Sequence, residues 1–86
     1  MKEVRWNLLK SERLKRTRGV SFDELIQAKL LAVKRHPTKT EQRLMLFEYR
    51  RYVWVVPYLE RENEIFLKTL YPSRKYTKLY KRGGVL

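Results

Sequence analysis

The sequence contains no cysteine and a single histidine, and these two shortages exclude several kinds of site. Without cysteine, the 86-residue chain has neither disulfides nor thiolate metal ligands, and one histidine does not suffice for a conventional zinc site. No apolar run approaches the roughly 20 residues of a membrane-spanning helix. The charged N-terminal sequence does not match a signal peptide. We therefore expect a cytoplasmic protein that uses no metal or other cofactor and does not enter a membrane.

Acidic residues are also scarce. Asp and Glu total 9 against 21 Lys and Arg, which gives a formal charge of +12, and no acidic residue follows Glu64. So large a charge on a small protein implies an acidic partner: a nucleic acid, an acidic protein or an anionic membrane surface. The apolar content of 43% argues against disorder. The length fits one domain over residues 1–86.

The stretch from Phe66 to Tyr80 reads as a strand followed by a cationic helix. Residues 66–71 alternate as a strand does, Pro72 interrupts the ladder, and Ser73 is suited to cap the helix that follows. At about 100° per residue, the apolar side chains of this helix lie opposite a surface formed by Arg74, Lys75, Lys78, Lys81 and Arg82. Cations of one sign near a helix N-terminus favour an anion. We predict a phosphate-facing surface here; the alternative is a solvated face that only keeps the helix soluble.

Two helices are predicted in the N-terminal third of the chain. Asn7 is suited to cap the first, over residues 8–17, and Gly19 is suited to end it. The apolar side of this helix consists of Leu8, Leu9 and Leu14. Ser21 and Glu24 form a capping box that begins the second helix. The first helix also carries cations that we interpret as a second flank of the phosphate-facing surface, or else as a solvated face: Lys10 and Arg13.

Two strands are predicted in the middle of the chain, over residues 42–49 and 52–58, because their side chains alternate with a period of two. Arg50 and Arg51 between them are few enough for a hairpin turn, although they lack the Asn-Gly pair that such turns prefer. Pro57 lies inside the second strand and cannot donate a ladder hydrogen bond. It therefore predicts a bulge or an unpaired edge at that point.

Several short motifs, in order along nearly the whole chain, together resemble one known family. They are W-N-x-x-K at 6–10, GVSFDE at 19–24, His36-Pro37, VWVVPY at 53–58 and FLKTLYPSRKYTK at 66–78. This set is similar to the BrnT-type toxins, small ribonucleases of bacterial type II toxin–antitoxin pairs with a compact fold like that of RelE. The resemblance implies a strand near 30–35 and an antitoxin partner, often a ribbon-helix-helix protein. The element order then predicts an α+β fold like that of RelE and barnase, with two N-terminal helices, an antiparallel four-stranded sheet and a short C-terminal helix.

Metal-independent cleavage of RNA requires a base for the ribose 2′-hydroxyl, an acid for the leaving 5′-oxygen and cations for the phosphoryl oxygens. Arg74 is the first candidate cation because a guanidinium fits two phosphate oxygens. Lys68 can add a second positive charge if it shares a pocket with Arg74. His36 is a candidate acid or base if it faces that pocket, and otherwise a turn residue. Tyr71 is a candidate proton donor, with core packing as the alternative.

These residues, together with the resemblance, predict an endoribonuclease that needs no metal and cleaves RNA by attack of a 2′-hydroxyl on the phosphodiester. The resemblance implies that it is a toxin held by a cognate antitoxin. The alternative is a non-catalytic basic module that binds RNA or DNA through the same surface. A third interpretation is a basic subunit that only partners an acidic protein. Turnover lost with binding retained in Arg74→Ala would favour the enzyme over the binding module.

Overall fold

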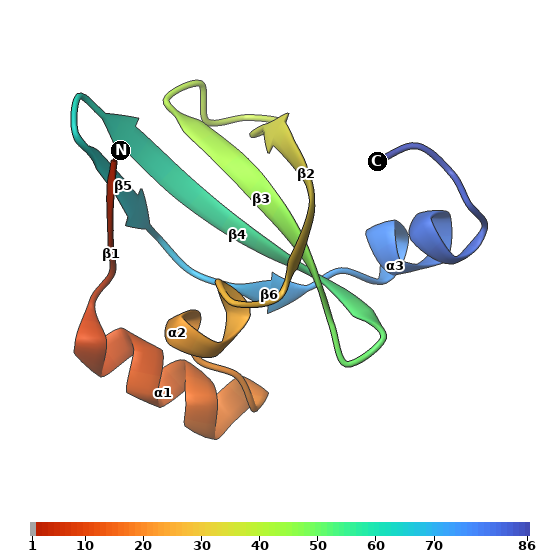
Figure 1. Cartoon of the computed structure of the whole chain (residues 1–86), viewed down its shortest axis with the longest axis horizontal. Coiled ribbons are helices and arrows are strands. Elements are labelled where there is room, and N and C mark those ends of the chain that lie inside the picture. The colour runs from red at the N-terminus through yellow and green to blue at the C-terminus, as the bar shows by residue number, and fades with distance from the viewer. Residues whose placement is uncertain (1) are drawn as a thin grey trace.

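The fold is a six-stranded sheet with helices on both of its faces (Figure 1). The computed structural model describes residues 2–86. Along the chain the elements are β1 (Glu3–Arg5), α1 (Leu8–Arg18), α2 (Phe22–Leu25), β2 (Lys29–Arg35), β3 (Gln42–Tyr49), β4 (Tyr52–Arg61), β5 (Glu64–Leu67), β6 (Tyr71–Pro72) and α3 (Arg74–Lys81). The strands lie in the order β1-β5-β4-β3-β2, and β6 also pairs with β4. The α+β class and the three helices are as predicted.

The sheet differs from the predicted four antiparallel strands, because it has six strands and is mixed. β1 pairs with β5 in parallel, with Val4 opposite Ile65. Its three residues are all exposed, so the sequence carries no alternation that would reveal a strand there. The strand predicted over 66–71 is divided into β5 and β6, which pair with different parts of β4. The physical reason for this division lies at Pro57 and is described with the site below.

The β3–β4 hairpin has the predicted two-residue turn. Tyr49 pairs with Tyr52, so Arg50 and Arg51 alone connect the strands. Both have positive φ, 51° and 65°, as a two-residue turn that follows the twist of its strands requires. The register therefore places two arginines in a conformation that residues with a Cβ rarely adopt.

The caps of α1 are as predicted, but its apolar side is not. The Asn7 side chain accepts a hydrogen bond from the Lys10 backbone N–H at 2.9 Å, and Gly19 ends the helix with φ of 82°. Leu8 and Leu9, however, are 72% and 78% exposed. The buried strip is Ser11 and Leu14, which lie three positions apart on one side of the helix. Leu8 is the first residue of the helix, one turn before that strip. Leu9 is rotated about 100° from Leu8 around the helix axis.

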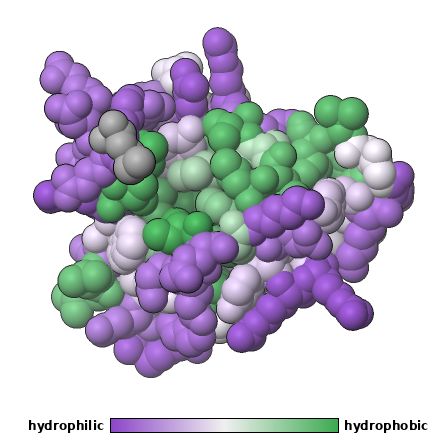
Figure 2. Space-filling model, viewed as in Figure 1, coloured by the Kyte–Doolittle hydropathy of each residue, from purple (hydrophilic) through white to green (hydrophobic). Residues whose placement is uncertain are grey.

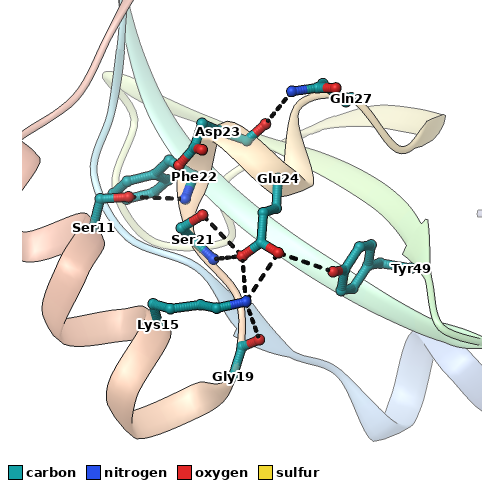
Figure 3. Close-up of polar contacts among 9 residues, drawn as sticks. All are labelled: Ser11, Lys15, Gly19, Ser21, Phe22, Asp23, Glu24, Gln27 and Tyr49. Carbon is teal, nitrogen blue, oxygen red and sulfur yellow. Dashed lines mark hydrogen bonds and ion pairs between the residues drawn. The ribbon is translucent and has the colours of Figure 1, made fainter.

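Glu24 joins α1, α2 and β3 through a set of polar contacts (Figure 3). Its carboxylate accepts hydrogen bonds from the Ser21 backbone N–H at 3.0 Å and from Lys15 Nζ at 2.8 and 2.9 Å. The Tyr49 hydroxyl donates to it at 3.5 Å. The Lys15 contact, followed by those of Ser21, lowers the pKa of Glu24 to about 2. The predicted capping box is thus present, and its carboxylate also fixes the two N-terminal helices against the sheet.

Each face of the sheet has its own core. One face packs against α1 and α2 through Leu14, Val20, Phe22, Leu25, Phe47, Val56, Tyr58, Leu67 and Leu70. The other face buries Leu44, Leu46, Val53 and Val55 beneath Tyr71, Tyr76 and Tyr80. Aromatic side chains of β6 and α3 therefore cover this second core together with Leu31 and Leu86.

Thr77 fastens α3 to the second face of the sheet. Its Oγ1 accepts a hydrogen bond from the Val53 backbone N–H at 2.8 Å and donates to the Ser73 carbonyl at 2.6 Å. Ser73 is the predicted N-cap, since its hydroxyl accepts from the Tyr76 N–H at 3.1 Å. The start of α3 is therefore fixed both by its cap and by a buried contact with β4.

Candidate active site

Pro57 interrupts the sheet and thereby opens a gap beside β4. The β4–β5 ladder ends at the pair Tyr58–Leu67. Lys68 still donates its backbone N–H to the Pro57 carbonyl at 2.8 Å, but proline has no N–H with which to complete the pair. The chain then leaves the ladder, buries Leu70, and rejoins β4 where Tyr71 pairs with Val55. The unpaired edge that Pro57 predicts is therefore present, and it divides the last strand in two.

A cavity of about 270 Å³ lies at this interruption. It is lined by Lys10, His36, Lys39, Gln42, Pro57, Lys68, Thr69 and Tyr71. Three of these side chains are lysines and none is a carboxylate, so the cavity attracts an anion. Lys68 also lines a neighbouring hollow of about 280 Å³ with Leu59, Arg61, Glu64 and Phe66. Its Nζ lies 5.7 Å from the centroid of the Phe66 ring.

His36 is both a turn residue and a cavity residue. Its Nδ1 accepts hydrogen bonds from the backbone N–H groups of Thr38 at 3.2 Å and Lys39 at 3.0 Å. These contacts fit the neutral tautomer with its hydrogen on Nε2. Because Nδ1 is engaged by its own loop, Nε2–H is the ring group available to a ligand. In this tautomer His36 is a hydrogen-bond donor, whereas action as a base through Nε2 would place an Nδ1–H against two N–H donors.

Two other cavity residues have pKa values that are shifted from their usual ranges. Burial, together with the charges of Arg13, Lys68 and Arg18, lowers the pKa of Lys10 below its usual 10.5. Burial, and to a lesser extent Tyr76, raises the pKa of the Tyr71 hydroxyl above its usual 10.0. Lys10 therefore releases its proton more readily than a free lysine, whereas Tyr71 holds its proton more strongly than a free tyrosine.

Arg74 does not line this cavity, so this cavity is not the pocket expected to be shared by Arg74 and Lys68. Arg74 is the first residue of α3, and its side chain is exposed. Tyr71 lies at the cavity where β6 begins, whereas β6 ends at Pro72 and Arg74 is the first residue of α3. The structure instead gathers Lys68, His36 and Tyr71, which were predicted, with Lys10, which was predicted only as an RNA-binding residue.

The remaining predicted RNA-binding residues lie outside the cavity on two helices and the turn after α3. Lys75, Lys78 and Lys81 are exposed on α3, and Arg82 follows it. Arg13 is exposed on α1 and shares a separate hollow of about 400 Å³ with Lys10. Lys10 thus links the α1 cations to the cavity.

Sequence reasoning missed Lys39 and Gln42 as cavity residues. Both lie at the β2–β3 connection, where His36 N–H donates to the Gln42 carbonyl at 3.2 Å. Gln42 is buried although it is polar. The three-residue spacing of Lys39 from His36 was the available signal, but only the closed turn places the two at one cavity.

The cations of the cavity and of α3 have no acidic partner among the ion pairs of residues 2–86. Those pairs are Lys2–Glu60, Arg5–Glu3 and Lys15–Glu24. Figure 2 shows an apolar area largely surrounded by hydrophilic side chains on the face that it presents.

Within the described residues no three His, Asp or Glu side chains form a group suited to a metal. None of the helices over the same residues is long and apolar enough to cross a membrane.

The geometry fits one tetrahedral anion with proton-transfer groups around it. Ammonium groups of Lys39 and Lys68 can bind non-bridging oxygens, and His36 Nε2–H can donate to a third. Lys10 and Tyr71 are titratable groups at the same cavity, and both have shifted pKa values. A phosphodiester is the group whose cleavage uses this combination of charge stabilisation and two proton transfers.

No family model and no curated protein matches the sequence. The fold is similar to that in the 1.1 Å crystal structure of the Brucella abortus ribonuclease toxin BrnT, with a TM-score of 0.60. The match covers 85% of this chain and 97% of that one, at 15% sequence identity. The resemblance to BrnT-type toxins is thereby confirmed at the level of the fold: this chain folds as that ribonuclease toxin does.

Proposed function

We propose that this protein is an endoribonuclease toxin that cleaves RNA without a metal, at the cavity beside Pro57. The ribose 2′-oxygen attacks phosphorus, the bond to the 5′-oxygen breaks, and the products are a 2′,3′-cyclic phosphate and a 5′-hydroxyl. One observation carries the proposal: on a fold shared with a ribonuclease toxin, three lysines, a histidine and a tyrosine meet in a cavity that no carboxylate lines.

The residues divide the chemical work as their environments suggest. Lys10 in its neutral form takes the 2′-hydroxyl proton, because burial and neighbouring cations lower its pKa. Tyr71 gives its proton to the leaving 5′-oxygen. Lys39, Lys68 and the His36 Nε2–H stabilise the charge that develops on the phosphoryl oxygens. Arg74 and the other α3 cations bind the RNA strand outside the cavity.

The test is cleavage of single-stranded RNA by the purified protein in the presence of a chelator. We expect cleavage products that end in a 2′,3′-cyclic phosphate, and a loss of roughly 10²–10³ in kcat for Lys68→Gln. Lys29→Gln is the matched control, since Lys29 is exposed on β2 and does not line the cavity. Intact RNA at stoichiometric protein, with binding retained, would leave a non-catalytic binding module instead.

The resemblance in sequence and the shared fold also support an antitoxin partner, which we propose to be a ribbon-helix-helix protein in the same cytoplasm. Such a partner would need acidic groups to match the +12 charge of this chain. Expression of the chain alone should arrest growth, and Lys68→Gln should relieve the arrest. Co-expression with the product of an adjacent ribbon-helix-helix reading frame should do the same and yield a complex on purification. Growth that continues unchanged with the parent protein folded and expressed would contradict the toxin assignment.

A further inference from the structure

The tip of the β3–β4 hairpin combines an unfavourable backbone with two exposed arginines. Arg50 and Arg51 have φ values of 51° and 65°, in the left-handed region that side chains with a Cβ disfavour. Two-residue turns of this kind prefer Asn-Gly, which adopts the conformation with less strain. Strain of this sort at non-glycine residues tends to occur at functional positions. For folding alone, Asn and Gly at these two positions would give the turn less backbone strain.

The two arginines are also available to a ligand. Both are exposed, and neither belongs to the ion pairs formed among residues 2–86. The Arg50 guanidinium carbon lies 5.1 Å from the centroid of the Tyr49 ring. Tyr49 is itself held, because its hydroxyl donates to Glu24 (Figure 3). Arg50 is therefore partly ordered before any ligand arrives, which lowers the entropy lost on binding.

The hairpin tip lies along the path that an RNA strand bound in the cavity would follow on leaving it. Along β4, Arg51 lies six residues from Pro57, or about 20 Å at 3.3 Å per residue. α3 bridges this interval, since Thr77 bonds to Val53 and the Tyr80 hydroxyl donates to Glu48 at 3.0 Å. Figure 1 shows α3 and the β3–β4 turn toward the same end of the molecule. The exposed α3 cations therefore connect the cavity with the tip.

We propose that Arg50 and Arg51 form a second phosphate-binding site, which holds the backbone of a single-stranded RNA several nucleotides from the bond that is cleaved. The proposal rests on the proposed function for its substrate class. Two adjacent guanidiniums suit phosphate because each presents a planar fork of donors. The site positions the strand and takes no part in bond cleavage.

The test compares three double variants in stability and in RNA affinity. Arg50→Asn/Arg51→Gly removes both charges and relieves the backbone, whereas Arg50→Lys/Arg51→Lys keeps the charges. Arg43→Gln/Arg61→Gln removes two charges from exposed residues of β3 and β4 that lie seven and ten residues along those strands from the tip. The probe is a 2′-O-methyl oligonucleotide, which lacks the attacking hydroxyl and so reports binding without cleavage. Affinity is measured by fluorescence anisotropy across a series of salt concentrations.

We expect Arg50→Asn/Arg51→Gly to raise Tm and yet to weaken binding on the order of tenfold. Its slope of log K against log salt should fall by about 1.4, because each lost phosphate contact on a single strand removes about 0.7. The lysine pair should keep most of the affinity, and the Arg43/Arg61 pair should lose less than about threefold. A lower Tm in the Asn-Gly variant, unchanged affinity, or an equal loss in the Arg43/Arg61 pair would each overturn the proposal.

The experiments test the ribonuclease assignment and the tip site independently. If the parent protein cleaves no RNA but the Asn-Gly variant still loses affinity for the probe, the ribonuclease assignment fails and the tip site stands. If the parent cleaves RNA and the tip variants bind the probe equally well, the tip site fails alone.

Discussion

Replacing His36 by asparagine or by glutamine separates its two contacts, because each amide reproduces one ring nitrogen. The asparagine oxygen can accept the turn hydrogen bonds that Nδ1 now receives from Thr38 and Lys39. The asparagine side chain is too short to reach the position of Nε2. The glutamine amide reaches that position as a donor, but the two hydrogen bonds that Nδ1 accepts in the turn are lost.

The expected magnitudes follow from these contacts. Removing one donor to a developing oxyanion typically lowers kcat by about 10²–10³, so His36→Asn should lose that much while its Tm stays within a few degrees of the parent. His36→Gln loses two hydrogen bonds at an exposed turn, where water can replace them, and together they contribute about 1 kcal/mol. In a domain of this size that is roughly 4–8 °C in Tm. Its kcat should remain within about tenfold of the parent.

The assay is single-turnover cleavage of a short RNA, with Tm measured on the same preparations. Temperatures well below each Tm keep both variants folded, so kcat reports chemistry. Full activity in His36→Asn would show that Nε2–H takes no part. Equal, large losses in both folded variants would show that His36 acts as a base, which a glutamine amide cannot replace, and would refute the tautomer assigned above.

Three further predictions concern other residues. Thr77→Val leaves the Val53 N–H buried without a partner, which should cost about 2 kcal/mol, or roughly 8–16 °C in Tm; Thr77→Ser should cost much less, and equal losses would contradict the role of the hydroxyl. Because the folded pKa of Glu24 is depressed to about 2, its contribution to stability is present above the unfolded pKa and is lost as pH falls through the folded one. The Tm difference between parent and Glu24→Gln should therefore be constant above about pH 5 and vanish toward about pH 2, as thermal melts across pH can check; a gap that widens in acid would reverse the sign. If neutral Lys10 is the base, kcat/KM should rise with pH through a pKa below 10.5, and Lys10→Arg should abolish the rise; a pH profile shared by parent and variant would exclude this role.

The sequence by itself determined the local structure. Asn7, Ser21 and Ser73 were recognisable as helix starts because capping depends on the chemistry of one side chain and its next three residues. The strands of the β3–β4 hairpin followed from the period-two alternation, which also fixed the length of the turn. The charge of +12 and its cluster after Glu64 indicated an anionic partner without reference to any fold.

Only the tertiary structure decided which cations meet. Lys10, His36 and Lys68 come from three separate parts of the chain, and they line one cavity because Pro57 cannot complete its pair with Lys68 and the sheet opens there. Arg74 comes after the chain has rejoined β4 through β6, and its side chain is exposed. Leu8 and Leu9 look like core residues in the sequence, but burial depends on where α1 crosses the sheet. Proximity between distant residues arises from packing and register, and a local pattern contains neither.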